Sequence, residues 1–241
     1  MQYNQYDNHG YGYGAQTPPP VPATRVNAVM KRVYANMFLG LLITAFTALF
    51  CQASPGVITF FAQNSWAMWA LIIAEFGIVI GVSAGINRLS TPSALLLFLA
   101  FAVINGLMLF PIFLVYTHTS IAKTFFITAG TFGAMSVYGF FTDRNLAGWG
   151  NFLFMALIGL IIASLVNIFV GSSTMSWIIS IAGVLIFVGL TAWDTQQIKN
   201  LTMMAPADSA GRLAVLGALT LYLDFINMFL YLLRLFGNSR D

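Results

Sequence analysis

The stretch that decides the fold is LYLDFINMFLYLLRLFG, Leu221 to Gly237, an apolar run near the carboxyl end with Asp224 inside it. Without that acid the run would be typical of a membrane-spanning helix, which needs about 20 mostly apolar residues. An ionised side chain at the centre of a bilayer costs roughly 2.5 to 3.5 kcal/mol on insertion scales. Asp224 therefore needs a protein or water partner inside a helix bundle.

The composition of the whole chain also indicates an integral membrane protein. Of its 241 residues, 59% are hydrophobic and only 7% are charged, whereas a soluble domain carries about a quarter charged residues. A single cysteine, Cys51, excludes an internal disulfide, and with only His9 and His118 no His/Cys metal centre can be built. A net charge of +3 does not indicate nucleic-acid binding. We expect no cofactor and no tightly bound metal.

Two regions follow from the distribution of apolar residues. Residues 1–24 are rich in Tyr, Gly, Asn, Gln and Pro, so we expect a disordered cytoplasmic tail. Residues 25–241 are expected to form an all-α transmembrane domain of seven helices, with an isolated kink at Pro111 in the third. The seven apolar runs, each about long enough to cross a bilayer, are 33–53, 66–86, 93–115, 121–142, 149–171, 175–198 and 213–236.

The basic residues predict the orientation of these helices. With a cytoplasmic amino terminus, seven of the ten lysines and arginines fall on the cytoplasmic side, which is the usual bias. They are Arg25, Lys31, Arg32, Arg88, Arg144, Lys199 and Arg212, against Lys123, Arg234 and Arg240 on the other side.

Small residues spaced by four predict close contacts between helices. The pattern occurs as Gly77, Gly81 and Gly85 in the second helix and as Ala129 and Gly133 in the fourth. Gly159 and Ala163 repeat it in the fifth helix. We expect these residues to pack against neighbouring helices.

Three acids lie inside predicted helices and need an explanation. Glu75, the only glutamate, is midway along the second helix, and Asp194 is near the end of the sixth in GLTAWDTQQIK. Asp224 shares one face of the seventh helix with Thr220, Asn227 and Tyr231, at helical spacings of four, three and four. This polar stripe should face protein or water inside the bundle.

Two interpretations of the aspartates remain open. In one, each acid forms a static pair that fixes helix register. In the other, Asp194 and Asp224 meet between two consecutive helices, share a proton because both cannot easily ionise, and respond to pH. Arg88, at the cytoplasmic end of the second helix, is either the counter-charge of this site or a simple positive-inside anchor.

The sequence resembles the Bax inhibitor-1 family, also called the transmembrane Bax inhibitor motif family, in its bacterial branch. The resemblance is carried by NGLMLFPIFLVYTHTSIAKTFFITAGTFGAMSVYGFFTDRNLAGWG (105–150), GLTAWDTQQIK (189–199) and LTLYLDFINMFLYLLRLFG (219–237). It implies a bundle in which the last helix is central and wrapped by the first six. It further implies a pH-sensitive calcium leak, in which Asp194 and Asp224 sense protons, Arg88 latches Asp224 and Glu75 lines the ion path.

Other functions fit the residues less well. An intramembrane aspartyl protease also places two aspartates on its sixth and seventh helices. The Gly-x-Gly-Asp and Pro-Ala-Leu motifs that are typical of such enzymes are absent from this sequence. A retinal protein would need a lysine in the seventh helix. A non-conducting interaction or regulatory protein of the cell-death-suppressor type remains the alternative.

The sequence therefore predicts a non-enzymatic, multi-pass protein of a bacterial cytoplasmic (inner) membrane that leaks calcium in response to pH. Its expected partners are the lipid bilayer, calcium, protons and other membrane proteins, but no nucleic acid.

Overall fold

The computed structural model describes residues 22–240, and these form helices joined by short connections. Seven spans are long and apolar enough to cross a membrane, which confirms the predicted seven-helix fold. The third span is broken at Pro111 into two helices, as the sequence predicts. The helices are α1 (Ala23–Gln52), α2 (Pro55–Gln63), α3 (Ser65–Gly85), α4 (Thr91–Leu109), α5 (Ile112–Val115), α6 (His118–Phe141), α7 (Ala147–Val170), α8 (Ser173–Met204) and α9 (Ala210–Phe236).

Some boundaries differ from those predicted. Helix α1 begins at Ala23, ten residues before the apolar run at Val33, because a helix can continue beyond the hydrocarbon into the headgroup region, where basic side chains are favourable. Ala23 and Thr24, assigned to the tail, are therefore helical, and the rest of the predicted tail up to residue 21 lies outside the described residues. The short helix α2 was not expected, because Ser54-Pro55-Gly56 reads as a turn, whereas Pro55 stands at a first helical position, which proline favours.

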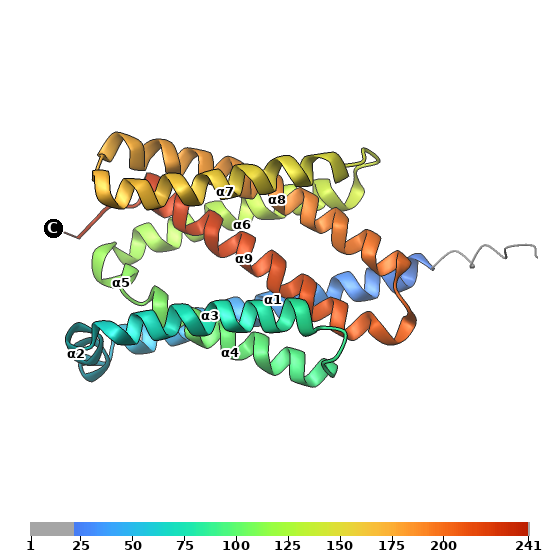
Figure 1. Cartoon of the computed structure of the whole chain (residues 1–241), viewed down its shortest axis with the longest axis horizontal. Helices are drawn as coiled ribbons and strands as arrows, with labels where there is room; N and C mark the ends of the chain where they lie inside the picture. Colours follow the sequence, from blue (N-terminus) through green and yellow to red (C-terminus); the bar gives the residue numbers. More distant parts are fainter. Residues whose placement is uncertain (1–21, 241) are drawn as a thin grey trace, which may run out of the picture.

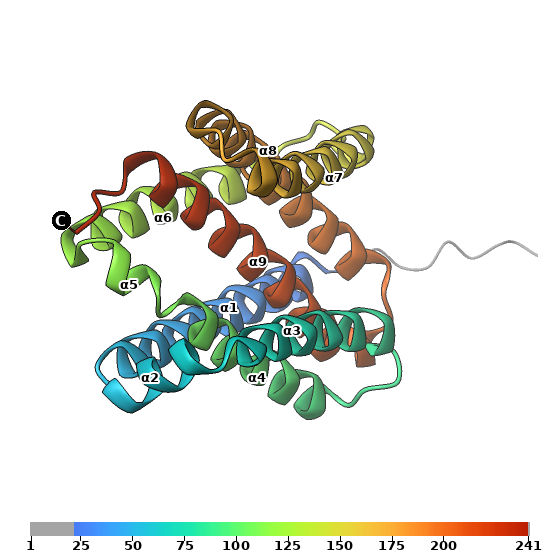
Figure 2. The same cartoon turned by 60° about the vertical axis from the view of Figure 1, so that its left-hand side comes forward.

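The helices form two groups with α9 between them. One group contains α1, α3 and α4, and the other contains α6, α7 and α8. Figures 1 and 2 show α9 running diagonally between the two groups from one end of the bundle to the other. Because the chain crosses seven times, the start of α1 and the end of α9 lie at opposite ends (Figure 1).

Helix α9 is the centre of the bundle. In its apolar window 67% of the residues are buried, against at most 39% in any other span. It packs mainly on α1, α4, α6 and α8, while α3 lies outside against α4 and α7 lies outside against α8. The central last helix is therefore as expected, with four of the six other spans forming its main contacts.

The close contacts between helices are made by other glycines than those predicted. A Cβ on Gly77, Gly81, Gly133 or Gly159 would have no heavy-atom neighbour from elsewhere in the described chain within 4 Å, so the expectation that they pack between helices was wrong. Their faces are open because α3 and α7 lie at the periphery and Gly133 faces a cleft. The glycines that do allow close approach include Gly40, Gly106, Gly139, Gly150 and Gly183.

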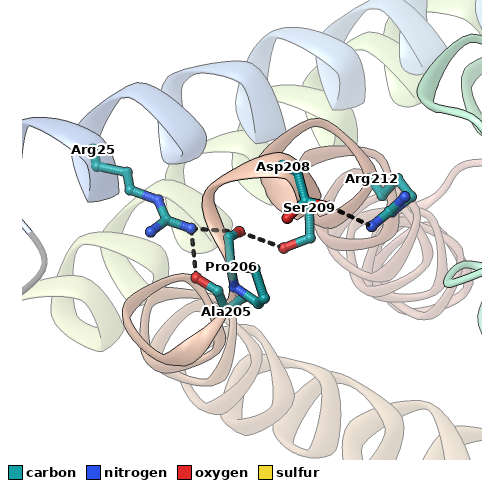
Figure 3. Close-up of polar contacts among 6 residues, drawn as sticks. All are labelled: Arg25, Ala205, Pro206, Asp208, Ser209 and Arg212. Atoms are coloured by element: carbon teal, nitrogen blue, oxygen red, sulfur yellow. Dashed lines mark hydrogen bonds and ion pairs between the residues drawn. The ribbon is translucent and has the colours of Figure 1, made fainter. Parts of the chain in front are cut away.

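Arg25, near the start of α1, is hydrogen-bonded to the connection between α8 and α9. The Arg25 guanidinium on α1 donates to the carbonyl oxygens of Ala205, at 2.6 Å, and Pro206, at 2.7 Å, the two residues that follow α8 (Figure 3). Asp208 and Arg212 form an ion pair at 3.7 Å on the α9 side of the same connection. The connection between α8 and α9 is thus held against the first turn of α1.

The opposite end is closed by the carboxyl-terminal residues. Tyr116 and Ser239 form an isolated antiparallel bridge, and the Thr117 amide donates to the Asn238 carbonyl oxygen at 3.1 Å. The Asn238 amide donates to Ser120 Oγ at 2.9 Å. The end of the chain therefore covers the connection between α5 and α6.

Candidate functional site

The structure brings Asp194 of α8 and Asp224 of α9 together. Their carboxyl groups lie within hydrogen-bonding distance of each other, and the two residues are 9% and 4% exposed. Within residues 22–240, no amide, hydroxyl or cationic side chain donates to the buried Asp224 Oδ2. Because a carboxylate only accepts hydrogen bonds, the contact between these two groups requires a proton on one of them. The contact is the one that the second interpretation of the sequence expects, with the two aspartates together between consecutive helices.

A small pocket lies between α8 and α9, on the side of Asp194 nearer to the connection between these helices. It measures about 60 Å³ and is lined by Asp194 and Gln197 on α8 and by Gly217 and Thr220 on α9, among others. The lining residues of α8 precede the connection that Arg25 holds, and those of α9 follow it. Asp194, rather than Asp224, is the acid that this pocket reaches.

The predicted polar stripe of α9 is the less buried side of that helix. Thr220 and Asn227 are half-buried and donate to carbonyl oxygens of their own helix, those of Leu216 at 3.1 Å and Leu223 at 2.8 Å. Tyr231 stacks on Phe187, with ring centroids 6.0 Å apart. Within the stripe, Asp224 is therefore the member that meets an acid of another helix.

A chain of hydroxyl groups runs beside the aspartate pair. Tyr34 of α1 contacts Ser136 of α6 at 2.5 Å between their oxygens, and Ser136 contacts Thr195 of α8 at 3.0 Å. Thr195 is the residue after Asp194, and its side chain is fully buried. The chain joins α1, α6 and α8 at the level of the pair.

Glu75 belongs to a different polar cluster. The Asn105 amide on α4 donates to Glu75 Oε1 at 2.9 Å, and the Tyr222 hydroxyl on α9 donates to Asn105 Oδ1 at 3.1 Å. The Tyr222 hydroxyl also lies 2.6 Å from the Thr44 hydroxyl of α1. Glu75 is thus linked to the central helix, but through Tyr222 and not through Asp224.

Arg88 does not meet either aspartate in this structure. It lies in the exposed turn after α3. Among residues 22–240 the ion pair is that of Arg212 with Asp208, and Arg88 forms none. The neighbouring Thr91 packs at Gly211, at the start of α9. Asp224 is 13 residues further along α9, or about 20 Å of helix. The latch implied by the family resemblance is therefore not formed here.

Three members of the Glu75 cluster were missed in the sequence. Asn105 and Thr44 are uncharged polar residues inside apolar runs, and Tyr222 lies on α9 away from its polar stripe. The signal that could have found Asn105 is its rarity, because an amide buried in a span is costly unless it is hydrogen-bonded.

Comparison with known proteins places the chain in a family. Residues 26–241 match the family described as "Inhibitor of apoptosis-promoting Bax1". The inner membrane protein YbhL of Escherichia coli is 48% identical over 222 residues, which cover 91% of this chain and 95% of that protein. An uncharacterized protein of Borreliella burgdorferi is 44% identical over 217 residues, covering 89% and 94%. Protein RP147 of Rickettsia prowazekii is 44% identical over 213 residues, covering 88% and 90%.

The match covers all seven spans of the described structure, including both aspartates, Glu75 and Arg88. The chain is a multi-pass integral membrane protein that belongs to the Bax inhibitor-1 family.

Proposed function

We propose that this protein is a pH-sensitive cation leak of a bacterial inner membrane, with calcium as its preferred ion and no enzymatic activity. The observation that carries the proposal is the contact between Asp194 and Asp224, two buried carboxyl groups from consecutive helices that require a shared proton. Loss of that proton would leave two like charges together in a poorly solvated site, which is unfavourable. The packing of α8 against α9 would then depend on pH.

The buried acids suit weak, transient binding of calcium during conduction and not tight binding. Calcium prefers carboxylate and carbonyl oxygens, typically six to eight of them. Within residues 22–240 no group of three or more Asp, Glu, His or Cys side chains could hold a metal ion. An ion would therefore meet one or two carboxylates at a time, and conduction requires such weak binding.

Glu75 and Arg88 take separate roles in this proposal. Glu75 lies on a different side of α9 from the aspartate pair, at the end of the Asn105–Tyr222 hydrogen bonds, and would offer a second carboxylate to an ion. Arg88, exposed here, would pair with Asp224 in a closed arrangement that differs from this one. Protonation of the aspartate pair would weaken that attraction and favour the arrangement seen here.

The proposal is tested by calcium entry into liposomes that hold the purified protein, read with a trapped dye across roughly pH 5 to 8. Wild type is compared with Asp224→Asn and with Asp143→Asn, an exposed acid outside the site. We expect a pH-dependent flux in wild type and Asp143→Asn that Asp224→Asn flattens. No flux above empty liposomes, from protein shown to be folded, would favour the non-conducting interaction protein instead.

A further inference from the structure

A cleft lies between α1 of one helix group and α6 of the other. Both α1 and α6 pack on α9, but on the cytoplasmic half a cavity of about 520 Å³ lies between them. Its inner wall includes Tyr34 on α1 and Phe132 and Ser136 on α6. Because these are membrane-spanning helices, the cleft opens sideways toward lipid and not toward water.

The end of the cleft nearest the cytoplasm is polar. Asn27 and Lys31 of α1 line it there, and both are exposed. No acidic side chain is among the residues that line the cavity. Lys199 of α8 does not line the cavity, but it donates to the carbonyl oxygen of the lining residue Phe140 at 2.7 Å, and its ammonium offsets the negative end of the α6 dipole. The rim is therefore positively charged and the interior is largely apolar.

The position of Lys31 fits the level of lipid headgroups. Helix α1 continues from Lys31 to Gln52, which at 1.5 Å per residue is about 32 Å. The hydrocarbon core of a bilayer is about 30 Å thick. Lys31 therefore stands at the cytoplasmic interface, and Tyr34 and Phe132 lie below it among the acyl chains.

We propose that this cleft binds one anionic phospholipid of the cytoplasmic leaflet. Its phosphate contacts Lys31 and Asn27, and an acyl chain runs along Gly133 and Phe132. Basic pockets between spans on the cytoplasmic side are suited to anionic headgroups, and each basic residue near such a surface contributes about 1 kcal/mol. The lipid-facing apolar wall and the cationic rim match the two halves of one phospholipid.

The bound lipid would lie beside the aspartate pair. The inner wall of the cleft contains Tyr34 and Ser136, whose hydroxyls continue to Thr195, the residue after Asp194. The lipid site stands on its own geometry and does not depend on ion conduction. Its test is therefore a binding measurement, which can succeed or fail whether or not the protein conducts.

Two open glycines on α6 provide a matched pair of variants. A Cβ at Gly133, which lines the cleft, or at Gly130, which does not, would meet no heavy atom from elsewhere in the described chain within 4 Å. Gly133→Leu fills the cleft, whereas Gly130→Leu adds the same side chain one turn away. Leucine is also a better helix former than glycine, so both variants are expected to fold.

The experiment is equilibrium binding to delipidated protein in detergent, by native mass spectrometry, of phosphatidylglycerol and of phosphatidylcholine with identical acyl chains. We expect phosphatidylglycerol to bind more tightly to wild type, and Gly133→Leu to weaken it at least fivefold while Gly130→Leu does not. Lys31→Gln should weaken it on the order of fivefold, which corresponds to about 1 kcal/mol. Lys123→Gln, at the other end of α6, should leave it unchanged.

Two results would overturn the proposal. Equal binding of phosphatidylglycerol to wild type and Gly133→Leu would show that the cleft is not the site. Equal binding of the two lipids by wild type, with no effect of Lys31→Gln, would show that the rim does not recognise an anionic headgroup. The unfolding midpoint of each variant, compared with that of wild type, shows whether weaker binding reflects a lost site or a lost fold. If Gly133→Leu is unstable, Lys31→Gln still tests the site, because Lys31 is exposed.

Discussion

Tyr222 and Asp224 are two positions apart on α9 and belong to two separate polar clusters. Successive residues turn by about 100° in an α-helix, so these side chains leave α9 on nearly opposite sides. Tyr222 meets Thr44 and Asn105 between α1 and α4, while Asp224 meets Asp194 on α8. The central helix therefore holds each of the two helix groups by a different set of buried polar contacts.

Removal of the Tyr222 hydroxyl should destabilise the bundle. Tyr222→Phe deletes the group that lies between Thr44 and Asn105 and leaves Asn105 Oδ1 without this donor. A buried polar atom left without its partner costs about 1 to 3 kcal/mol. We expect a lower unfolding temperature in detergent than for Tyr138→Phe, at an exposed position on α6. Equal midpoints for the two variants would contradict this role of Tyr222.

The stability of wild type should fall as pH rises. The contact between Asp194 and Asp224 needs one proton, and removing it places two negative charges side by side in a buried site. In Asp224→Asn the side-chain amide can donate to Asp194 without a shared proton. Unfolding midpoints measured from acidic to alkaline pH should therefore decline in wild type and change less in this variant. A parallel decline in both proteins would assign the pH dependence to other groups.

Arg25 should hold the connection between α8 and α9. Arg25→Lys keeps the charge, but the lysine side chain is one bond shorter than the path to Arg25 Nη2, the single nitrogen that donates to both the Ala205 and the Pro206 carbonyl oxygens. Hydrogen bonds from charged groups contribute about 1.5 to 3 kcal/mol. We expect faster amide hydrogen exchange across residues 205–212 in Arg25→Lys, and no change in Arg32→Lys, whose side chain is exposed. Unchanged exchange in both would show that Arg25 is not needed there.

Gly139 should tolerate no side chain, unlike the glycines singled out by their spacing. A Cβ at Gly139 would collide with the backbone of Ala192 on α8, whereas one at Gly77 meets open space. Overpacking of this kind typically costs about 1 to 3 kcal/mol. Gly139→Ala should lower the unfolding temperature, and Gly77→Ala should leave it the same or raise it slightly. The reverse order would show that α3, not α6, makes the close contact.

The sequence predicted the spans well because lipid imposes a length and an apolar composition on each of them. It also singled out Asp224 and Asp194, since a charge inside such a span is rare. It did not distinguish Gly77 from Gly139, because a glycine that faces lipid and one that faces another helix look the same in a single sequence. Nor did it reveal the Thr44–Tyr222 contact, which depends on how three separate spans are placed around α9.

The central position of α9 has a consequence for how the protein is made. It follows all the other described helices in the chain, yet it lies between the two helix groups and completes their contacts. Until it inserts, Asp194 lacks its partner and Thr44 and Asn105 lack the Tyr222 hydroxyl. Before α9 inserts, the two helix groups meet through few contacts of their own, such as that between Tyr34 and Ser136. A chain cut short before Ala210 would therefore leave Asp194 and Asn105 in the membrane without the partners that α9 supplies.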